Sequence, residues 1–233
     1  IGAGPANPVT IVDATANLEK AARDIVRGAS FDNNLMCTSE KCMVVEESVS
    51  DRFIYELLKN GVYYIRNEAE IQKLLNAAVT EDFVINKKLE GRSAKEILEY
   101  AGIPASKAIK LIVAETGRMH PFVITELMMP LVPLVKAADF DEALEIALEV
   151  EQGYKHTATI HSESIEHLNR AARELQTSVF VKNGPSLMGI GFDKEGHTSF
   201  TIATTTGEGT TTARHFARRR RCTLPSGFSI RCL

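Results

Sequence analysis

A cysteine stands in a polar junction near the start of the chain. Cys37 follows an Asp-Asn-Asn run at residues 32–34 and precedes Thr38 and Ser39, within the stretch SFDNNLMCTSEKCMVV. A thiol is a strong nucleophile, and its attack on a carbonyl needs access, a nearby base or lowered pKa, and donors for the oxyanion. Backbone N–H groups left free in this turn would supply such donors. The local pattern leaves two interpretations open: a nucleophile, or a half-buried loop cysteine without chemistry.

The bulk composition narrows the class of protein. The 233 residues are 44% hydrophobic with a net charge of -3, which fits one large domain and predicts no binding to nucleic acid or membrane. No apolar run approaches the roughly 20 residues of a membrane span, and no signal peptide opens the chain. The four scattered cysteines indicate neither a disulfide scaffold nor a CxxC zinc site, so we expect reduced thiols and a cytoplasmic protein.

The elements that must position Cys37 alternate between strand and helix patterns. Helical spacing or capping residues mark the helices, with Thr15 or Asn17, Asn67 and Ser93 as caps and Gly28 weakening the end of the first helix. The order predicts an α/β fold with a mainly parallel sheet. Strands are expected at 9–12, 41–47, 62–65, 108–115, 131–137, 157–162 and 177–184, and helices at 13–30, 48–61, 67–78, 93–102, 139–153 and 163–176.

Several other polar groups could suggest function. His156, His161 and His167 show no HExxH pattern or i,i+4 pair, so no metal site is expected, and His120 is interpreted as structural. The TGEG sequence at 206–209 fits an anion-binding nest or a plain turn. The basic run at 218–221 lacks interleaved aromatic residues, which favours contacts between subunits over nucleic acid.

Four stretches in order carry a resemblance to a known family. ASFDNNLMCTSEK, HPFVITELMMPLVPLVK, FVKNGPS and TTTGEGTTTARHFARRRRC closely resemble the coenzyme A (CoA)-acylating branch of the aldehyde dehydrogenase superfamily. The match is closest to the acetaldehyde and propionaldehyde dehydrogenases of ethanolamine and propanediol utilisation, over roughly their C-terminal half. The chain has no initiator methionine and opens within an organised segment, so we expect a piece of a longer protein.

The resemblance implies a division of the chain. Residues 1–16 would end a Rossmann-like cofactor-binding domain, and residues 17–205 would form the aldehyde dehydrogenase-like catalytic α/β domain. Residues 206–233 would provide a return segment and the C-terminal strand of an oligomerisation arm. The implied assembly is a homo-oligomer, a dimer or tetramer, joined through that strand.

The resemblance also implies roles for single residues. Cys37 falls on the family's nucleophile, and Glu126 in TELMMP falls on the carboxylate that holds the nicotinamide ribose hydroxyls. Without the resemblance, the residues around Glu126 in the sequence would indicate a solvated carboxylate at a helix start. Asn34 and Asn183 would line the substrate pocket. Met188 would help to set the acyl-chain size or would belong to the core.

The start of the chain departs from the hydrolytic relatives. Ile1 lies opposite their general-base glutamate, and an apolar side chain cannot activate water. The thioester on Cys37 is therefore expected to survive until a thiol attacks it, as an acylating enzyme requires.

The implied activity is oxidation of a short aliphatic aldehyde to acyl-CoA, with NAD as cofactor and CoA as co-substrate. The family also suggests association with the shell of a bacterial microcompartment. This stretch alone is expected to be inactive, because it contains no glycine-rich turn for the pyrophosphate. Two alternatives stay open: the dehydrogenase half of a bifunctional aldehyde-alcohol dehydrogenase, or a non-catalytic assembly fragment.

Overall fold

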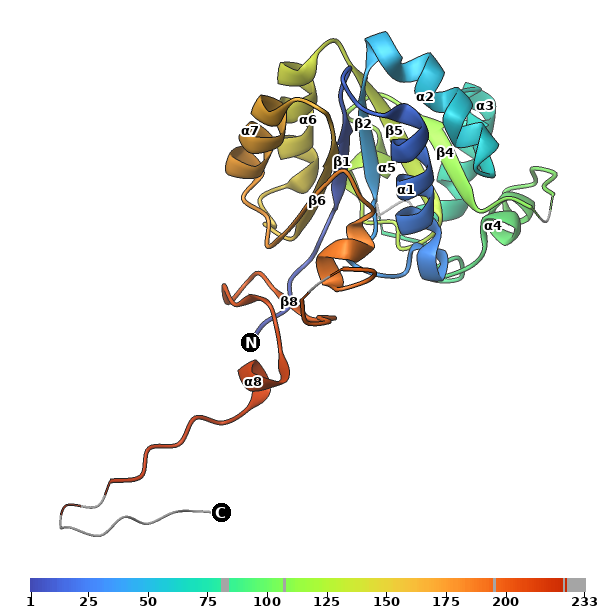
Figure 1. Cartoon of the computed structure of the whole chain (residues 1–233). Coiled ribbons are helices and arrows are strands. Elements are labelled where there is room, and N and C mark those ends of the chain that lie inside the picture. Colours follow the sequence, from blue (N-terminus) through green and yellow to red (C-terminus); the bar gives the residue numbers. More distant parts are fainter. Residues whose placement is uncertain (81–83, 107, 195, 224, 226–233) are drawn as a thin grey trace.

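Seven strands form one sheet in which every neighbouring pair is parallel (Figure 1). The computed structural model describes residues 1–80, 84–106, 108–194, 196–223 and 225. The order across the sheet is β3-β4-β5-β2-β1-β6-β7, so β2 and β1 are central. The strands are β1 (Val9–Val12), β2 (Cys42–Glu46), β3 (Val62–Ile65), β4 (Leu111–Glu115), β5 (Leu131–Ala137), β6 (Thr157–His161) and β7 (Val179–Lys182). This confirms the predicted α/β class and all seven predicted strands.

The helices connect these strands in the predicted order. The six long ones are α1 (Leu18–Ser30), α2 (Glu47–Lys59), α3 (Glu68–Ala78), α4 (Ala94–Tyr100), α6 (Phe140–Glu151) and α7 (Ile165–Leu175). The sequence patterns did not predict the short elements η1 (Phe31–Asn34), α5 (Pro121–Ile124), η2 (Ser186–Ile190), β8 (Ile202–Ala203), β9 (Gly209–Thr210) and α8 (Ala213–Phe216). No helix among the described residues is both long and apolar enough to cross a membrane.

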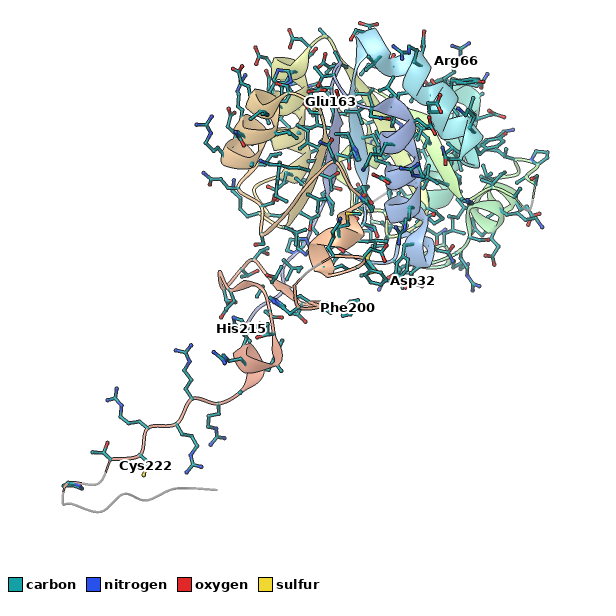
Figure 2. All side chains as sticks on the ribbon, viewed as in Figure 1. Asp32, Arg66, Glu163, Phe200, His215 and Cys222 are labelled. Carbon is teal, nitrogen blue, oxygen red and sulfur yellow. The ribbon has the colours of Figure 1, made fainter. Side chains whose placement is uncertain are left out.

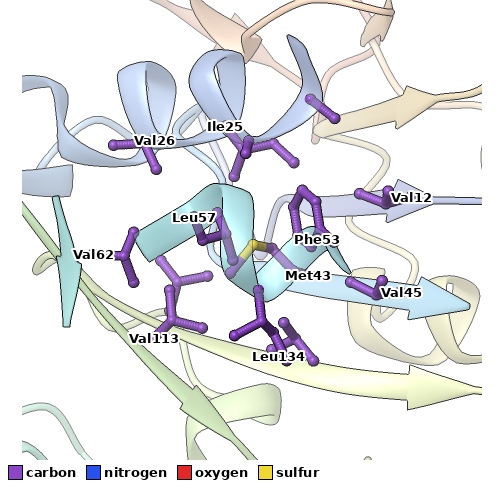
Figure 3. Packing of buried hydrophobic residues seen from close by; sticks show 14 of the residues in the cluster. Val12, Ile25, Val26, Met43, Val45, Phe53, Leu57, Val62, Val113 and Leu134 are labelled. Carbon is purple, nitrogen blue, oxygen red and sulfur yellow. The ribbon is translucent and has the colours of Figure 1, made fainter. Parts of the chain in front are cut away.

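Both faces of the sheet are covered by helices, which explains the continuous apolar runs of the strands. Along β2, Met43 and Val45 pack with α1 and α2, whereas Cys42 and Val44 point to the opposite face beneath α6 and α7. Figure 3 shows the first of these clusters, with Phe53 of α2 beside Met43. A third cluster joins α3 and α4 to β4 and β5.

Side-chain caps fix where the long helices begin. Asn17 caps α1 by accepting a hydrogen bond from the Lys20 amide, so the alternative cap, Thr15, is wrong. Asn67 caps α3, and Ser93 forms a capping box with Glu96 at the start of α4. These contacts confirm the caps predicted for α3 and α4.

The structure bears on the segments at two of the expected domain limits, near β1 and beyond α8. β1 lies between β2 and β6, so residues 9–12 belong to the same body as residues 17–205, and a boundary after residue 16 does not divide this structure. Beyond α8, residues 217–223 form no strand. Much of the expected oligomerisation strand, residues 224 and 226–233, lies outside the described residues. That strand therefore stays a prediction.

We predict that Phe53→Ala lowers the free energy of unfolding by about 3–5 kcal/mol, because the ring is fully buried between α2 and the sheet. Tyr55, on the same helix, is 62% exposed, so Tyr55→Ala should change that free energy by no more than about 0.5 kcal/mol. Urea unfolding of both variants measures the difference. Equal losses would show that this cluster does not carry the stability assigned to it.

Candidate active site

Cys37 lies between η1 and β2, at the amino-terminal edge of the parallel sheet. Its side chain is partly exposed, whereas Cys42 inside β2 is fully buried. Burial raises the pKa of the Cys42 thiol far above its usual range, so that thiol stays protonated. Cys222 is exposed on the C-terminal segment, well away from the sheet (Figure 2). Cys232 lies outside the described residues.

A left-handed turn delivers the chain to Cys37. Asp32, Asn33 and Asn34 have φ angles of 48°, 51° and 60°, a conformation that Asp and Asn tolerate better than other non-glycine residues. The Asn33 side chain donates to the Gly91 carbonyl at 2.9 Å, which fastens the turn to the loop before α4. The turn expected at this polar run is therefore present, with all three residues in the left-handed backbone conformation.

Asn34 is a buried connector. Its Nδ2 donates to the Ala29 carbonyl at 2.7 Å and to the Glu40 carbonyl at 3.0 Å, so both amide hydrogens are used inside the protein. Its Oδ1 and its main-chain carbonyl both accept from Lys41 Nζ at 2.6 Å. These contacts give Asn34 a positioning role behind the thiol, and its expected place in the substrate pocket stays a prediction.

Lys41 brings a positive charge within electrostatic range of Cys37. The side chain is 2% exposed, and burial lowers the pKa of its ammonium to about 8. The charges of Glu126, Cys37 and Glu40 oppose that shift, which places all three within electrostatic range of the ammonium. Both hydrogen bonds that the structure shows for Nζ go to Asn34. Lys41 is therefore a nearly buried positive charge beside the thiol.

Glu40 ties the site to η2. It is fully buried and accepts from the Ser186 amide at 2.8 Å and from Ser186 Oγ at 2.9 Å. Burial raises the pKa of its carboxyl to about 7. A Cβ at Gly28 would lie 2.2 Å from the Glu40 carboxylate, so α1 passes closely enough only with glycine there. Gly28 serves this close approach, and α1 continues beyond it to Ser30.

Glu126 lies between α5 and β5, at the same edge as Cys37. Its Oε1 atom is buried and has no hydrogen-bond partner. Burial raises the pKa of its carboxyl, while the charge of Lys41 and a hydrogen bond from the Ala6 amide oppose the rise. A buried carboxylate oxygen without a partner is costly, and a ligand that donates hydrogen bonds would remove that cost.

The thiol of Cys37 is not strongly acidic in this chain. Burial raises its pKa, the negative charge of Glu126 raises it further, and the positive charge of Lys41 lowers it. Lys41 therefore favours the thiolate, while desolvation and Glu126 favour the thiol. The fraction of Cys37 that is thiolate therefore depends on pH and on any charge that a bound substrate brings to the site.

His156 is a further residue of this edge that the sequence analysis set aside. It is 2% exposed, directly precedes β6, and its Nδ1 lies 2.9 Å from Thr157 Oγ1. Burial lowers the pKa of the imidazole to about 4, and the charge of Lys41 lowers it further, so the ring is neutral near pH 7. The effect of the Lys41 charge on His156 places the ring within electrostatic range of that ammonium.

The groups named so far share one position in the fold. Ala6, Cys37, Glu126 and His156 each come shortly before a strand, and those strands, β1, β2, β5 and β6, are neighbours in the sheet. Amino ends of parallel strands meet at one edge, so residues far apart in sequence converge there. Sequence reasoning missed Glu40, Lys41 and His156, although their positions just ahead of apolar runs were a usable signal.

The two remaining predicted residues lie differently. Asn183 binds the Ser162 backbone through both amide atoms, at 2.9 Å and 2.8 Å, which joins the carboxyl ends of β7 and β6. The structure therefore does not bring Asn183 to the amino edge with Cys37. Met188 packs, with Met36, against the cluster around β7 and η2, and Met36 precedes Cys37 directly.

Together these features define a class of site: a cysteine nucleophile at the edge of a parallel α/β sheet, with a buried cation and a carboxylate nearby. No family model matches the chain. A propanal dehydrogenase (CoA-propanoylating) of Salmonella typhimurium is 53% identical over 99% of this chain and 50% of its own length. The chain thus spans about half the length of the curated relatives it matches.

Three solved structures are also similar to this chain in sequence and in fold. A Rhodopseudomonas palustris propionaldehyde dehydrogenase with bound CoA and an acylated cysteine, and an engineered glycolyl-CoA reductase with bound NADP+, are each 47% identical. Both give a TM-score of 0.92 over 96% of this chain and 51% of theirs. A propionaldehyde dehydrogenase from a Clostridium phytofermentans fucose utilisation microcompartment is 40% identical, with a TM-score of 0.91 over 96% of this chain and 51% of its own. The chain is therefore homologous to CoA-acylating aldehyde dehydrogenases.

We predict that Lys41→Met raises the pKa of Cys37, because the positive charge that lowers this pKa is lost. Each unit of pKa changes the thiolate fraction below the pKa about tenfold, so alkylation by iodoacetamide near pH 7 should slow by roughly three- to tenfold. Mass spectrometry of the Cys37 peptide across pH measures the rate. Lys59→Met, which removes a half-exposed lysine of α2, is the control, and identical pH profiles for both variants would exclude the role of Lys41.

Proposed function

We propose that the protein carrying this chain oxidises a short aliphatic aldehyde to its acyl-CoA, with Cys37 as the nucleophile. The observation that carries the proposal is the partly exposed thiol within electrostatic range of Lys41 and of Glu126, whose buried Oε1 has no hydrogen-bond partner. The acylated cysteine and bound CoA of the Rhodopseudomonas palustris structure support it.

In the first proposed step, the partly exposed Cys37 thiol gives its proton to solvent water, and the thiolate attacks the aldehyde carbon. A C–S bond forms, and the carbonyl π pair moves onto oxygen as the oxyanion of a thiohemiacetal. The nearby ammonium of Lys41 favours the thiolate, because it lowers the pKa of the thiol. Collapse of the oxyanion expels a hydride from the same carbon and leaves a thioester on Cys37.

A nicotinamide nucleotide, which we propose to be NAD, accepts that hydride when bound. The residues present fit such a group, because the buried Glu126 Oε1 has no partner and a carboxylate can accept from both hydroxyls of a ribose. Glu126 would hold and orient the ribose beside Cys37. Ribose hydroxyls would also satisfy the buried oxygen that this chain leaves unpaired.

In the second proposed step, the CoA thiolate attacks the thioester carbonyl, and Cys37 leaves as a thiolate. Ile1 would leave the site without the general base of the hydrolytic relatives, so water competes poorly. The packing of Met36 and Met188 around η2 makes Met188 the proposed limit on acyl-chain size. Asn34 would act indirectly, through Lys41 and the left-handed turn.

We place the protein in the cytoplasm, inside a bacterial microcompartment, as a homo-oligomer joined through its C-terminal segment. Support for the microcompartment comes from the similar enzyme of the fucose utilisation microcompartment. The exposed arginines at 218–221 extend beyond α8, where a second copy could cover them (Figure 2). The oligomer and the shell association remain proposals.

Cys37→Ala should abolish acyl-CoA formation by the complete protein that carries this chain, because the other described thiols are either fully buried, as Cys42 is, or on the C-terminal segment, as Cys222 is. Cys42→Ala is the matched control. It removes a neighbouring thiol that is fully buried inside the sheet, and it should leave kcat within about twofold. Production of propionyl-CoA from propanal, NAD and CoA measures both variants. Turnover by Cys37→Ala would refute the assignment of the nucleophile.

Omission of CoA distinguishes the acylating reaction from hydrolysis. General-base assistance is typically worth about 10²–10⁴-fold, so without a base for water the thioester on Cys37 should persist. Aldehyde and NAD alone should give a burst of about one NADH per active site. Steady turnover should then resume when CoA is added. A steady NADH rate without CoA, close to the rate with it, would favour a hydrolytic dehydrogenase.

A further inference from the structure

The opposite edge of the sheet carries a second group of polar side chains. Asp13 directly follows β1, and Glu46 ends β2. The two strands pair in parallel with Val12 opposite Val45, so the next residues, Asp13 and Glu46, come level with each other. Asp32 and Glu163, labelled in Figure 2, mark the two edges: Asp32 belongs to η1, which precedes Cys37 in the chain, and Glu163 follows the carboxyl end of β6.

The first turn of α7 adds an imidazole to these two carboxylates. His167 Nδ1 lies 2.7 Å from Asp13 Oδ2, and its ring stacks on Phe140 with 3.9 Å between centroids. One ligand atom from each of Asp13, Glu46 and His167 lies within 4.8 Å of the others. The stacking and the hydrogen bond hold the ring with Nδ1 toward the carboxylates.

Glu46, His167 and Phe140 line a cavity of about 420 Å³, whereas Asp13 is fully buried. Glu46 lines the cavity although it is 6% exposed, and among the described residues no side chain donates a hydrogen bond to its carboxylate. Asp139, Asp141 and Glu166 also line the cavity, whereas its one guanidinium among the described lining residues, Arg170, is bridged to Asp141 and Glu174. The cavity therefore has an excess of negative charge.

The topology makes this edge a natural ligand position. The connection after β1 leads through α1 on one face of the sheet, and the connection after β6 leads through α7 on the other. In open α/β sheets, ligands usually bind at the carboxyl ends of two neighbouring strands whose connections leave on opposite faces of the sheet. The proposed reaction at Cys37 uses the amino edge and leaves this crevice unassigned.

We propose that Asp13, Glu46 and His167 bind one divalent first-row transition metal ion, of the Mn²⁺ or Zn²⁺ type. Two carboxylates and an imidazole nitrogen are donors that these ions accept, and they leave positions open for water. Donors at about 2.0–2.2 Å from one ion lie about 3.0–3.5 Å apart in tetrahedral or cis-octahedral positions, so closing the present spacing needs a side-chain shift of roughly 1–2 Å.

The surroundings of Asp13 support this role. Its Oδ1 accepts from the Thr15 amide at 2.8 Å and from Thr15 Oγ1 at 2.7 Å, which fixes the carboxylate. Its Oδ2 faces His167 Nδ1, and an ion would take the place of the proton between these two atoms. The sequence analysis expected no metal site because it searched for local histidine spacing. The three donors come instead from β1, β2 and α7, which only the fold brings together.

Titration of the metal-free protein with Mn²⁺, followed by the electron paramagnetic resonance signal of the free ion, tests this proposal. One Mn²⁺ should bind per chain, and Zn²⁺ should displace it. Glu46→Gln keeps the side-chain size and His167→Asn keeps a shorter polar side chain, and each should weaken binding by at least about tenfold. Glu166→Gln removes a carboxylate of the same cavity that is outside the donor set, and it should bind within about twofold of the original protein.

Circular dichroism and thermal unfolding without metal show whether each variant is folded. Because His167→Asn and Glu46→Gln alter different elements, a folding defect in one still leaves the other as a test. Binding of no Mn²⁺ by the original protein at submillimolar concentration would overturn the proposal. Equal Mn²⁺ affinity of the original protein and a folded donor variant would overturn it as well.

Discussion

The arrangement at the amino edge depends on one constraint: the ammonium of Lys41 is buried. An ionised group away from water is stable only when it is hydrogen-bonded or paired, and both hydrogen bonds shown for this ammonium end on Asn34. Asn34 presents its two oxygens to Lys41 because the turn at residues 32–34 is left-handed. The same turn leads directly to Cys37. The cation that stabilises the thiolate and the loop that carries the thiol are therefore held by one set of contacts.

The two acids at this edge differ in how fully the chain satisfies their hydrogen-bonding groups. Glu40 is fully buried but satisfied by Ser186, whereas Glu126 keeps an oxygen without a partner. A structural carboxylate needs all its hydrogen bonds within the chain, and a ligand-binding carboxylate must keep capacity for the ligand. By this criterion Glu126 is the acid suited to a ribose, and Glu40 is a tie between β2 and η2.

The sequence predicted the scaffold better than the site. Alternating apolar runs and capping residues such as Asn67 and Ser93 act locally, so the strands and long helices could be predicted from neighbours in the chain. Cys37 and Glu126 were found through family motifs. Lys41 was missed because a lysine beside a glutamate is typical of a surface, and its burial depends on Asn34 and on packing. The close approach at Gly28 was hidden too, since it involves a carboxylate from another element.

The strand β2 joins the two edges of the sheet, with Lys41 just before its start and Glu46 at its end. At about 3.3 Å per residue, the five steps between them span roughly 17 Å, too far for direct contact between the two side chains. Paired on both sides by β1 and β5, this strand is also a stiff spacer that resists sliding. Apart from burial, the charges that shift the pKa of Glu46 belong to Asp13, His167 and Asp139 of its own edge. A mutation at one edge of the sheet should therefore leave the side chains at the other edge in place.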